Sequence, residues 1–251
     1  MPTNGLFATL EGLAVPAVTA EEMRQVDEIA VGQFGLGILQ MMENAGRALA
    51  KQAMDMFASA TDAVVVLAGA GGNGGGGLCS ARHLHNRGFS VIIGLDVAVE
   101  ALHGPALAQW QTLRAAGILP AEPYAVQRAI HEGALVIDAL VGYGLRGALR
   151  GRIADLVSLC HDESARVLSL DVPSGWDATS GTRGPVAIDP ERILTLALPK
   201  TGLSKVQSRI CLANLGIPKE VYAAVGIHWQ WPSKQSWIDL AVVDEPRMRQ
   251  A

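Results

Sequence analysis

Short apolar runs alternate with amphipathic stretches along the chain, and this pattern predicts strands and helices in turn. Runs that are apolar throughout are typical of strands buried on both faces of a parallel sheet. They predict strands at 63–68, 89–95, 134–137, 166–170, 193–198 and 210–214, with a short one near Ile118. Apolar residues at helical spacing predict helices at 20–34, 38–57, 78–87, 101–116, 126–131 and 153–161.

The regular alternation of strands and helices predicts one doubly wound α/β domain over residues 1–251, with its core at about 19–225. The first helix has a specific start signal, because Thr19 and Glu22 have the spacing of a capping box. The first eighteen residues resemble a loose arm. The last segment, 229–251, is rich in Trp and polar residues and is expected to wrap the surface or fray.

The predicted strand at 63–68 opens into a loop with seven glycines between Gly69 and Gly77. Glycine is used where the backbone takes a positive φ or lies against a ligand. A helix that starts after such a loop offers unpaired N–H groups at the positive end of its dipole, which suits a phosphate. Gly69, Gly71 and Gly74 also fit the G-x-G-x-x-G spacing. The loop therefore predicts a nucleotide site, and the alternative is a tight turn without a ligand.

Composition narrows the possible functions. The chain has a net charge of −4 and is 49% hydrophobic, which indicates a large core and no basic surface for nucleic acid or an anionic membrane. The cysteines Cys79, Cys160 and Cys211 form no C-x-x-C pair, so neither a disulfide framework nor a zinc site is indicated. No apolar run is long enough to span a bilayer, and the start of the chain lacks a signal peptide's basic residues. We therefore expect a cytoplasmic protein.

Two aspartates lie at the ends of predicted buried strands, and a glycine-bearing loop follows each. Asp138 follows the strand at 134–137, and Asp171 follows the strand at 166–170. Ligands of open α/β sheets bind beyond the carboxyl ends of the strands, so we expect both aspartates in one site. Either one alone could instead cap a turn. With the hydroxyl of Ser174 nearby, oxygen ligands for a hard cation are available.

Several short motifs occur in a fixed order along residues 19–225. They are Met42–Arg47, Gly74–Leu78, Ala81–Leu84, Asp138–Gly147, Asp171–Gly175, Pro199–Leu203 and Leu215–Pro218. Each motif alone is weak, whereas the ordered set is highly specific. In these motifs the chain resembles the YjeF N-terminal domain family, the NAD(P)H-hydrate epimerases.

The resemblance implies a Rossmann-like three-layer αβα sandwich with a mostly parallel central sheet, assembled as a homodimer. It implies an isomerase that interconverts the R and S forms of hydrated NADH and NADPH (NADHX and NADPHX), so that a partner dehydratase can repair one epimer. It also implies a bound potassium ion (K+), with Asn73, Asp138 and Ser174 as ligands. The substrate residues would be Gly72, Asn73, Gly74, Gly75, Gly76, Gly142, Tyr143, Gly144, Leu145, Arg146, Gly147, Ala148 and Asp171, with Asp171 as the acid–base group.

The glycine loop departs from the family pattern N-N-G-G-D-G. Gly72 replaces its first asparagine and Gly76 replaces its aspartate, which removes an acceptor that could orient the ligand. A non-catalytic nucleotide-binding or scaffold domain of the same fold is therefore the alternative function. An ordinary NAD-dependent dehydrogenase fits less well, because the sequence contains no convincing catalytic histidine or Tyr–Lys pair.

Overall fold

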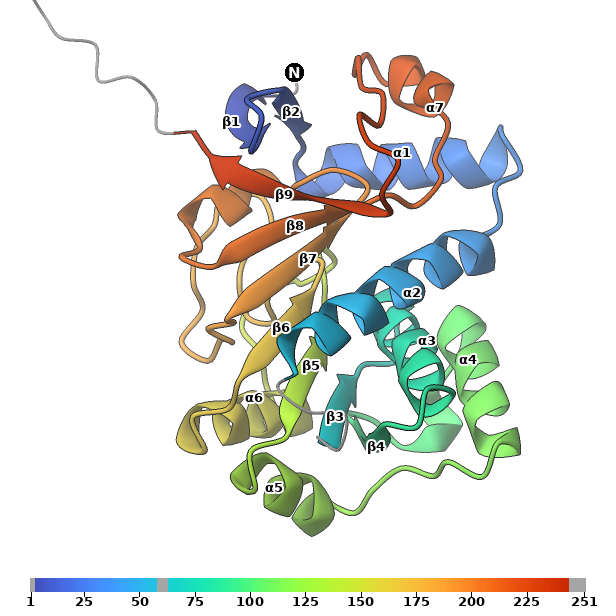
Figure 1. Cartoon of the computed structure of the whole chain (residues 1–251), viewed down its shortest axis with the longest axis vertical. Helices are drawn as coiled ribbons and strands as arrows, with labels where there is room; N and C mark the ends of the chain where they lie inside the picture. The colour runs from blue at the N-terminus through green and yellow to red at the C-terminus, as the bar shows by residue number, and fades with distance from the viewer. Residues whose placement is uncertain (1–2, 58–62, 244–251) are drawn as a thin grey trace, which may run out of the picture.

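The computed structural model describes residues 3–57 and 63–243, and within them one nine-stranded sheet runs through the molecule. The strand order is β2-β1-β9-β8-β7-β6-β5-β3-β4 (Figure 1). The strands from β8 to β4 in this order are parallel to one another, whereas β9, β1 and β2 are antiparallel additions at one end. The parallel strands are β3 (Ala63–Ala68), β4 (Ser90–Leu95), β5 (Leu135–Ala139), β6 (Val167–Leu170), β7 (Arg192–Leu196) and β8 (Arg209–Ala213).

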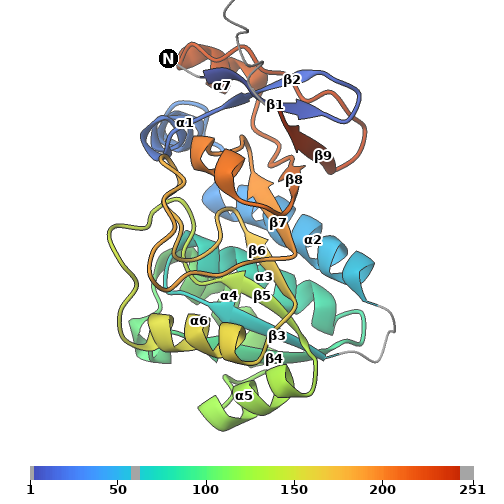
Figure 2. The ribbon, with the colours of Figure 1, turned by 90° about the vertical axis from the view of Figure 1, so that its left-hand side faces the viewer.

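Helices cover both faces of the parallel strands, which confirms the predicted three-layer αβα sandwich. Figure 2 shows α2 (Ile38–Met56) and α6 (Arg152–Asp162) on opposite sides of the sheet. Alternate residues of β3 serve the two cores: Val64 and Val66 belong to the core under α2, whereas Val65 and Leu67 belong to the core under α6. The other covering helices are α3 (Gly72–His85) and α4 (Gly104–Ala115) beside α2, and α5 (Pro123–His131) beside α6.

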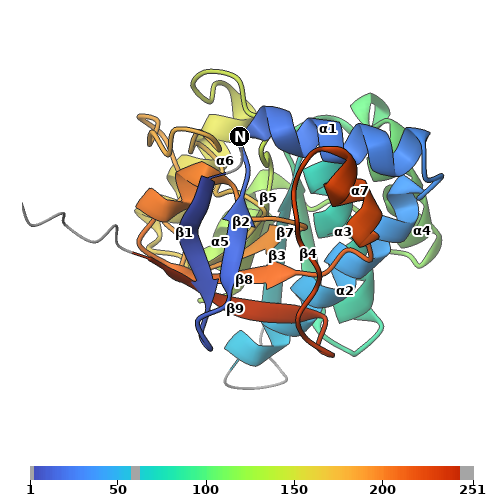
Figure 3. The same cartoon turned by 90° about the horizontal axis from the view of Figure 1, so that it is seen from above.

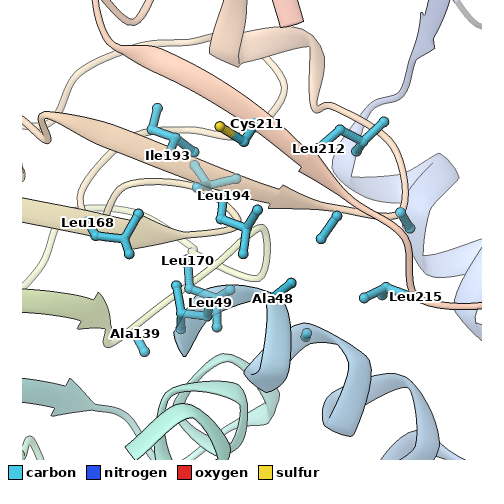
Figure 4. Packing of buried hydrophobic residues seen from close by; sticks show 14 of the residues in the cluster. Ala48, Leu49, Ala139, Leu168, Leu170, Ile193, Leu194, Cys211, Leu212 and Leu215 are labelled. Atoms are coloured by element: carbon cyan, nitrogen blue, oxygen red, sulfur yellow. The ribbon is translucent and has the colours of Figure 1, made fainter. Parts of the chain in front are cut away.

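The core under α2 is built from small and branched side chains. Ala48 and Leu49 of α2 lie against the strand residues Leu170 and Leu194 (Figure 4), and all four are buried. Burying each leucine side chain contributes about 2 kcal/mol to stability. This packing fixes α2 across the sheet and therefore fixes one wall of the site described below.

Helix α1 (Ala20–Gly32) begins at the predicted capping box. The Thr19 side chain accepts a hydrogen bond from the Glu22 backbone N–H at 3.1 Å, and the Glu22 carboxylate accepts one from the Thr19 N–H at 2.8 Å. The predicted helix over 38–57 also agrees with α2, which ends at Met56. Local signals were sufficient for both helices because caps and helical periodicity are properties of neighbouring residues.

The prediction of a loose N-terminal arm is wrong. Residues of the arm form β1 (Thr3–Thr9) and β2 (Ala14–Ala17), and β1 pairs with β9 (Trp237–Val242) from the other end of the chain (Figure 3). The pairing joins segments more than two hundred residues apart, so the local pattern carried little signal for it. Residues 244–251 of the predicted C-terminal segment lie outside the described residues.

Smaller differences occur at connections. The predicted strand near Ile118 is reduced to an isolated bridge between Ile93 and Pro120, and a 3-10 turn (Val99–Ala101) precedes α4, which begins at Gly104 rather than at Ala101. A 3-10 turn at Thr201–Lys205 and helix α7 (Lys219–Ala224), which contacts α1, were not predicted. Across 3–57 and 63–243, every helix is too short or too polar to cross a membrane.

Candidate active site

A cavity of about 1000 Å³ opens beyond the carboxyl ends of β3 and β5. Strand β4 lies on one side of β3 and β5 on the other, so the chain changes direction across the sheet at this point. Ligands of doubly wound sheets bind at such a switch point. The walls come from α1, α2, the start of α3, and the loops after β4, β5 and β6. The cavity therefore lies at the sheet edge where the sequence predicted the site.

Most of the glycine segment belongs to the start of α3 rather than to a loop before it. The helix was predicted to begin at Leu78, but it begins at Gly72, and Gly71 is its N-cap. The seven glycines, all within the described residues, have no positive φ. Close packing accounts for several of them instead. For example, a Cβ on Gly75 would lie 2.6 Å from the Met42 Cε atom.

Three of the glycines have the separate roles that the dinucleotide-binding spacing implies. A Cβ on Gly69 would lie 2.1 Å from the Leu140 carbonyl oxygen, and a Cβ on Gly74 would lie 1.7 Å from the Gly69 carbonyl oxygen. A Cβ on Gly71 would meet nothing within 4 Å, and Gly71 lines the cavity. Gly69 thus permits the close approach of the loop after β5, Gly74 permits α3 to pack tightly on the end of β3, and Gly71 leaves the N-terminus of α3 open to an anionic ligand.

Asp171 lines the cavity directly after β6, in the left-handed conformation with a φ of 69°. Its carboxylate forms an ion pair with the Lys200 ammonium, and the two side chains are 4% and 1% exposed. It also accepts hydrogen bonds from the backbone N–H groups of Tyr143 at 3.2 Å and Leu196 at 3.3 Å. Asp171 is therefore a rigidly held carboxylate at the cavity wall, rather than a turn cap.

Lys200 is a site residue that the sequence analysis missed. Besides its pairing with Asp171, its ammonium donates to the Leu196 carbonyl at 2.9 Å and lies 5.5 Å from the centre of the Tyr143 ring. A buried lysine requires partners of this kind, since an unpaired buried charge is costly. The available signal was a lysine directly after the largely apolar stretch that ends with Pro199.

Tyr143 connects the loop after β5 to helix α1. Its hydroxyl donates a hydrogen bond to the Asp27 carboxylate at 2.5 Å, and both residues line the cavity. Burial is the largest influence on Asp27 and raises its pKa, while the hydrogen bond from Tyr143 lowers the pKa in part. Burial and the nearby carboxylates raise the pKa of the Tyr143 hydroxyl as well. The role of Asp27 could not be predicted from the sequence, because its partner is remote in the chain.

Asp138 is a fully buried residue of β5, in register with Ser169 of β6. Its carboxylate accepts hydrogen bonds from the Ser169 hydroxyl at 2.8 Å, the Ser174 backbone N–H at 2.9 Å and the Ser174 hydroxyl at 2.5 Å. Burial raises the pKa of Asp138, and the hydrogen bonds offset this only in part. No lysine or arginine among the described residues forms an ion pair with it. The set offers oxygen ligands and one negative charge.

Asn73 and Gly142 bring the predicted metal residues close to the cavity. The Asn73 Nδ2 atom is buried without a hydrogen-bond partner among the described residues, and Asn73 lines the cavity. A Cβ on Gly142 would lie 3.1 Å from Asn73 Oδ1 and 3.0 Å from Asp171 Oδ2, so a side chain at this position would crowd both groups. Val141, also a lining residue, donates its N–H to the Ser174 hydroxyl at 3.2 Å. The Asp138–Ser174 pair thus lies directly behind the cavity wall.

The structure places the remaining predicted substrate residues in two groups. Gly72, Gly76, Gly142, Tyr143 and Gly144 line the cavity together with Asn73 and Asp171. The other predicted residues are not among its lining residues, and these are Gly74, Gly75, Leu145, Arg146, Gly147 and Ala148.

Comparisons with known proteins show the family to which this chain belongs. Residues 38–202 match the family described as YjeF-related protein N-terminus. A Dehalogenimonas lykanthroporepellens protein named NAD(P)H-hydrate epimerase is 42% identical over 88% of this chain and 90% of its own length. A protein of the same name from Rhodopirellula baltica is 33% identical over 83% of this chain and 88% of its own length. A Hyperthermus butylicus protein named bifunctional NAD(P)H-hydrate repair enzyme Nnr is 34% identical over 84% of this chain and 40% of its own length.

A solved structure agrees with the fold. The crystal structure of the yeast protein ynu0 superposes with a TM-score of 0.79 and covers 89% of this chain and 99% of its own length, at 22% identity. At 22% identity this likeness shows the fold alone. The family match and the two epimerase relatives extend over most of the sequence. This chain therefore belongs to the YjeF-related protein N-terminus family.

Proposed function

We propose that this protein is an NAD(P)H-hydrate epimerase, which interconverts the R and S forms of hydrated NADH and NADPH in the repair of nicotinamide nucleotides. The names of its relatives support this activity. The single observation that carries the proposal is the buried Asp171–Lys200 pair at the cavity wall. It lies in the same cavity as the open N-terminus of α3, so a phosphate and a reacting ring can be held together.

The reaction requires little more than controlled proton transfer. Carbon 6 of the hydrated ring bears a hydroxyl beside the ring nitrogen. Protonation lets that hydroxyl leave as water, while the nitrogen lone pair forms a double bond to carbon 6. Water then adds to the opposite face and loses a proton, which gives the other epimer with no net change in atoms or electrons. A positioned acid–base group accelerates both halves of the reaction.

We assign the proton transfers to Asp171, with Lys200 as the group that holds its charge and position. The Asp171 carboxyl can donate its proton to the departing hydroxyl, and the carboxylate that this leaves, hydrogen-bonded to the Lys200 ammonium, can take a proton back from the attacking water. The backbone amides of Tyr143 and Leu196 fix the carboxylate in one orientation. Asn73 has an unused buried donor at the cavity wall, which suits a polar group of the substrate.

We also propose that Asp138, Ser174 and Asn73 hold a potassium ion. The donor set fits a hard monovalent cation, because it provides carboxylate, hydroxyl and amide oxygens. The buried Asp138 carboxylate lacks a cationic side-chain partner among the described residues, and a bound cation would offset its burial cost. When bound, the ion would supply positive charge behind the cavity wall that carries Val141 and Gly142.

The biological setting follows from the same activity. The bifunctional repair enzymes among the relatives support a pathway in which a dehydratase consumes one of the two epimers. We further propose a homodimer in the cytoplasm, a proposal that rests on the family resemblance and on the composition of the chain. Light scattering of the purified protein measures the oligomeric state directly.

The experiment that tests the proposed activity starts from one purified epimer of NADHX. A catalytic amount of the protein is added in potassium buffer, and chromatography follows the ratio of R to S over time. We expect the protein to bring the two epimers to equilibrium much faster than buffer alone. A nucleotide-dependent rise in melting temperature without any acceleration would instead support the non-catalytic alternative.

A further inference from the structure

Asp96 occupies a position in the cavity that the epimerisation chemistry leaves unused. It directly follows β4, and its backbone N–H donates to the Ala68 carbonyl at 3.2 Å, which anchors it beside the end of β3. Its side chain lines the same cavity as Gly71 and Asp171. The Asp96 Oδ1 atom is buried without a hydrogen-bond partner among the described residues. Asp96 therefore combines a place at the cavity wall with a buried carboxylate oxygen that has no partner among the described residues.

An unsatisfied buried acceptor is costly unless a ligand supplies the missing donor. Burial is the main influence on Asp96 and raises its pKa, while a hydrogen bond with its own backbone and the positive charge of Arg152 lower the pKa in part. The Arg152 guanidinium donates to the Leu95 carbonyl at 2.7 Å and is not a lining residue of the cavity. A ligand with neutral hydroxyl donors would satisfy Asp96 without adding charge.

The topology indicates which part of a dinucleotide would reach Asp96. In dinucleotide-binding βαβ units, a glycine turn after the first strand holds the pyrophosphate, and an acidic residue after the second strand binds the adenosine ribose. Here β3, the Gly69–Gly74 turn, α3 and β4 form that unit, and Asp96 follows its second strand. In such units the glycine turn must leave room for the pyrophosphate, and Gly71 leaves that room here, because a Cβ on it would meet nothing within 4 Å.

The order of the strands indicates that an extended ligand would lie along this edge of the sheet. Neighbouring strands in the order β4-β3-β5-β6 carry Asp96, the glycine turn, the Gly142–Gly144 loop and Asp171 at their carboxyl ends. Three strand spacings separate β4 from β6, which is about 14 Å. A ribose at Asp96 and a reacting ring at Asp171 therefore lie at opposite ends of one extended ligand, with its phosphates at the start of α3.

We propose that Asp96 binds the 2′-hydroxyl of the adenosine ribose and makes this enzyme prefer NADHX to NADPHX. This inference rests on the proposed function, because it concerns the same cavity. A 2′-phosphate in that position would face a carboxylate and remove the hydroxyl donor that the carboxylate needs. Among the described residues that line the cavity, Arg24 on α1 is the one cationic side chain, and it already pairs with Glu21.

The direct test measures binding without turnover. Isothermal titration compares ADP-ribose with 2′-phospho-ADP-ribose for the wild type, for Asp96→Asn and for Glu28→Gln. Glu28 is a matched control, because it is another lining carboxylate but lies on α1. We expect the wild type to bind ADP-ribose at least about tenfold more tightly than the phosphorylated probe. Asp96→Asn should reduce that ratio by about the same factor, and Glu28→Gln should leave it unchanged.

Equal affinity of the wild type for the two probes would overturn the proposal. A ratio that survives Asp96→Asn, or that changes equally in Glu28→Gln, would overturn it as well. Thermal melting verifies that each variant is folded, and no described hydrogen bond to Oδ1 is lost in Asp96→Asn. Turnover of NADHX and NADPHX is then measured separately. Absence of turnover on both substrates contradicts the epimerase function, whereas the binding ratio still decides the role of Asp96.

Discussion

The Tyr143 hydroxyl and the Asp27 carboxylate lie 2.5 Å apart and join two segments separated by 116 residues in the chain. Tyr143 belongs to the loop after β5, and Asp27 belongs to α1, so the hydrogen bond ties the helix to the rim of the sheet. Lys200 lies over the same tyrosine ring and pairs with Asp171. One chain of contacts therefore links α1 to the group that we assign to proton transfer.

The Asp27→Asn variant should gain stability relative to the wild type as the pH rises. The native pKa of Asp27 is raised above its ordinary 3.8, so the native state binds this proton more tightly than the unfolded state does. The contribution of Asp27 to stability is therefore lost as the pH rises from about 3.8 through the raised native pKa. Asparagine does not titrate and keeps an acceptor for Tyr143. Urea unfolding at a series of pH values measures the difference, and a difference independent of pH would contradict the assignment.

Asp171→Asn should lose most turnover and about 3 kcal/mol of stability, because it leaves the Lys200 charge buried and unpaired. The double variant Asp171→Asn with Lys200→Met removes that charge and should recover much of the stability while remaining inactive. Urea unfolding and the epimer assay are applied to both proteins. Wild-type turnover in the double variant would show that the pair only holds the structure, and it would move the proton transfers to another group.

Gly76→Asp, which restores the carboxylate usual in the family, should destabilise the protein by about 1–3 kcal/mol through overpacking. A Cβ on Gly76 would lie 2.7 Å from the Leu170 Cδ2 atom, although the backbone of Gly76 is helical and has no positive φ that would disfavour aspartate. Adding Leu170→Val removes the opposing methyl group and should restore part of the melting temperature. Gly72→Ala is the matched control, because a Cβ there meets nothing within 4 Å.

Turnover of the same Gly76 variants addresses the departure from the family pattern. If the missing carboxylate limits the rate, the double variant should exceed the wild type in epimerase turnover or in discrimination between substrates. A well-folded double variant without either gain would mean that the departure at Gly76 does not set activity.

Asp138→Ala should weaken the response of the protein to potassium. Asp138 is the only carboxylate in the proposed set of ligands, so its loss removes most of the attraction for the ion. Potassium chloride should raise the melting temperature of the wild type more than sodium chloride does, and the variant should respond equally to both salts. Ser169→Ala is the control, since it removes a hydrogen bond to Asp138 but leaves the proposed ligands in place. An unchanged potassium titration in Asp138→Ala would place the ion elsewhere.

The parallel strands, their helices and the position of the site could be predicted from the sequence, because buried apolar runs, caps and strand-end loops are local patterns. Asp138 and Asp171 were expected at one site. Asp138 lies within β5, Asp171 directly follows β6, and these two strands are neighbours in the sheet. The strands β1 and β9 could not be predicted in this way, because each is specified by a partner distant in the chain.

The start of α3 was misplaced for a different reason. Six consecutive residues from Gly72 to Gly77 include five glycines, and glycine has low helix propensity. Tertiary packing overrides that preference, since α2 and the ends of the strands approach α3 too closely for larger side chains. Lys200 and Asp27 were missed because their roles depend on contacts with Asp171 and Tyr143 that only the folded chain creates.

The most direct test of the central claim follows a single epimer of NADHX in potassium buffer made with water enriched in oxygen-18. The measured quantities are the rate of approach to the epimer equilibrium and the label at carbon 6. If the hydroxyl is lost and water is added, the wild-type protein should accelerate equilibration, and each inverted molecule should carry oxygen from the labelled water. With Asp171→Asn, both equilibration and incorporation of the label should proceed only at the rate seen in buffer. Equilibration at the buffer rate with wild-type protein, or inversion without incorporation of the label, would contradict the central claim.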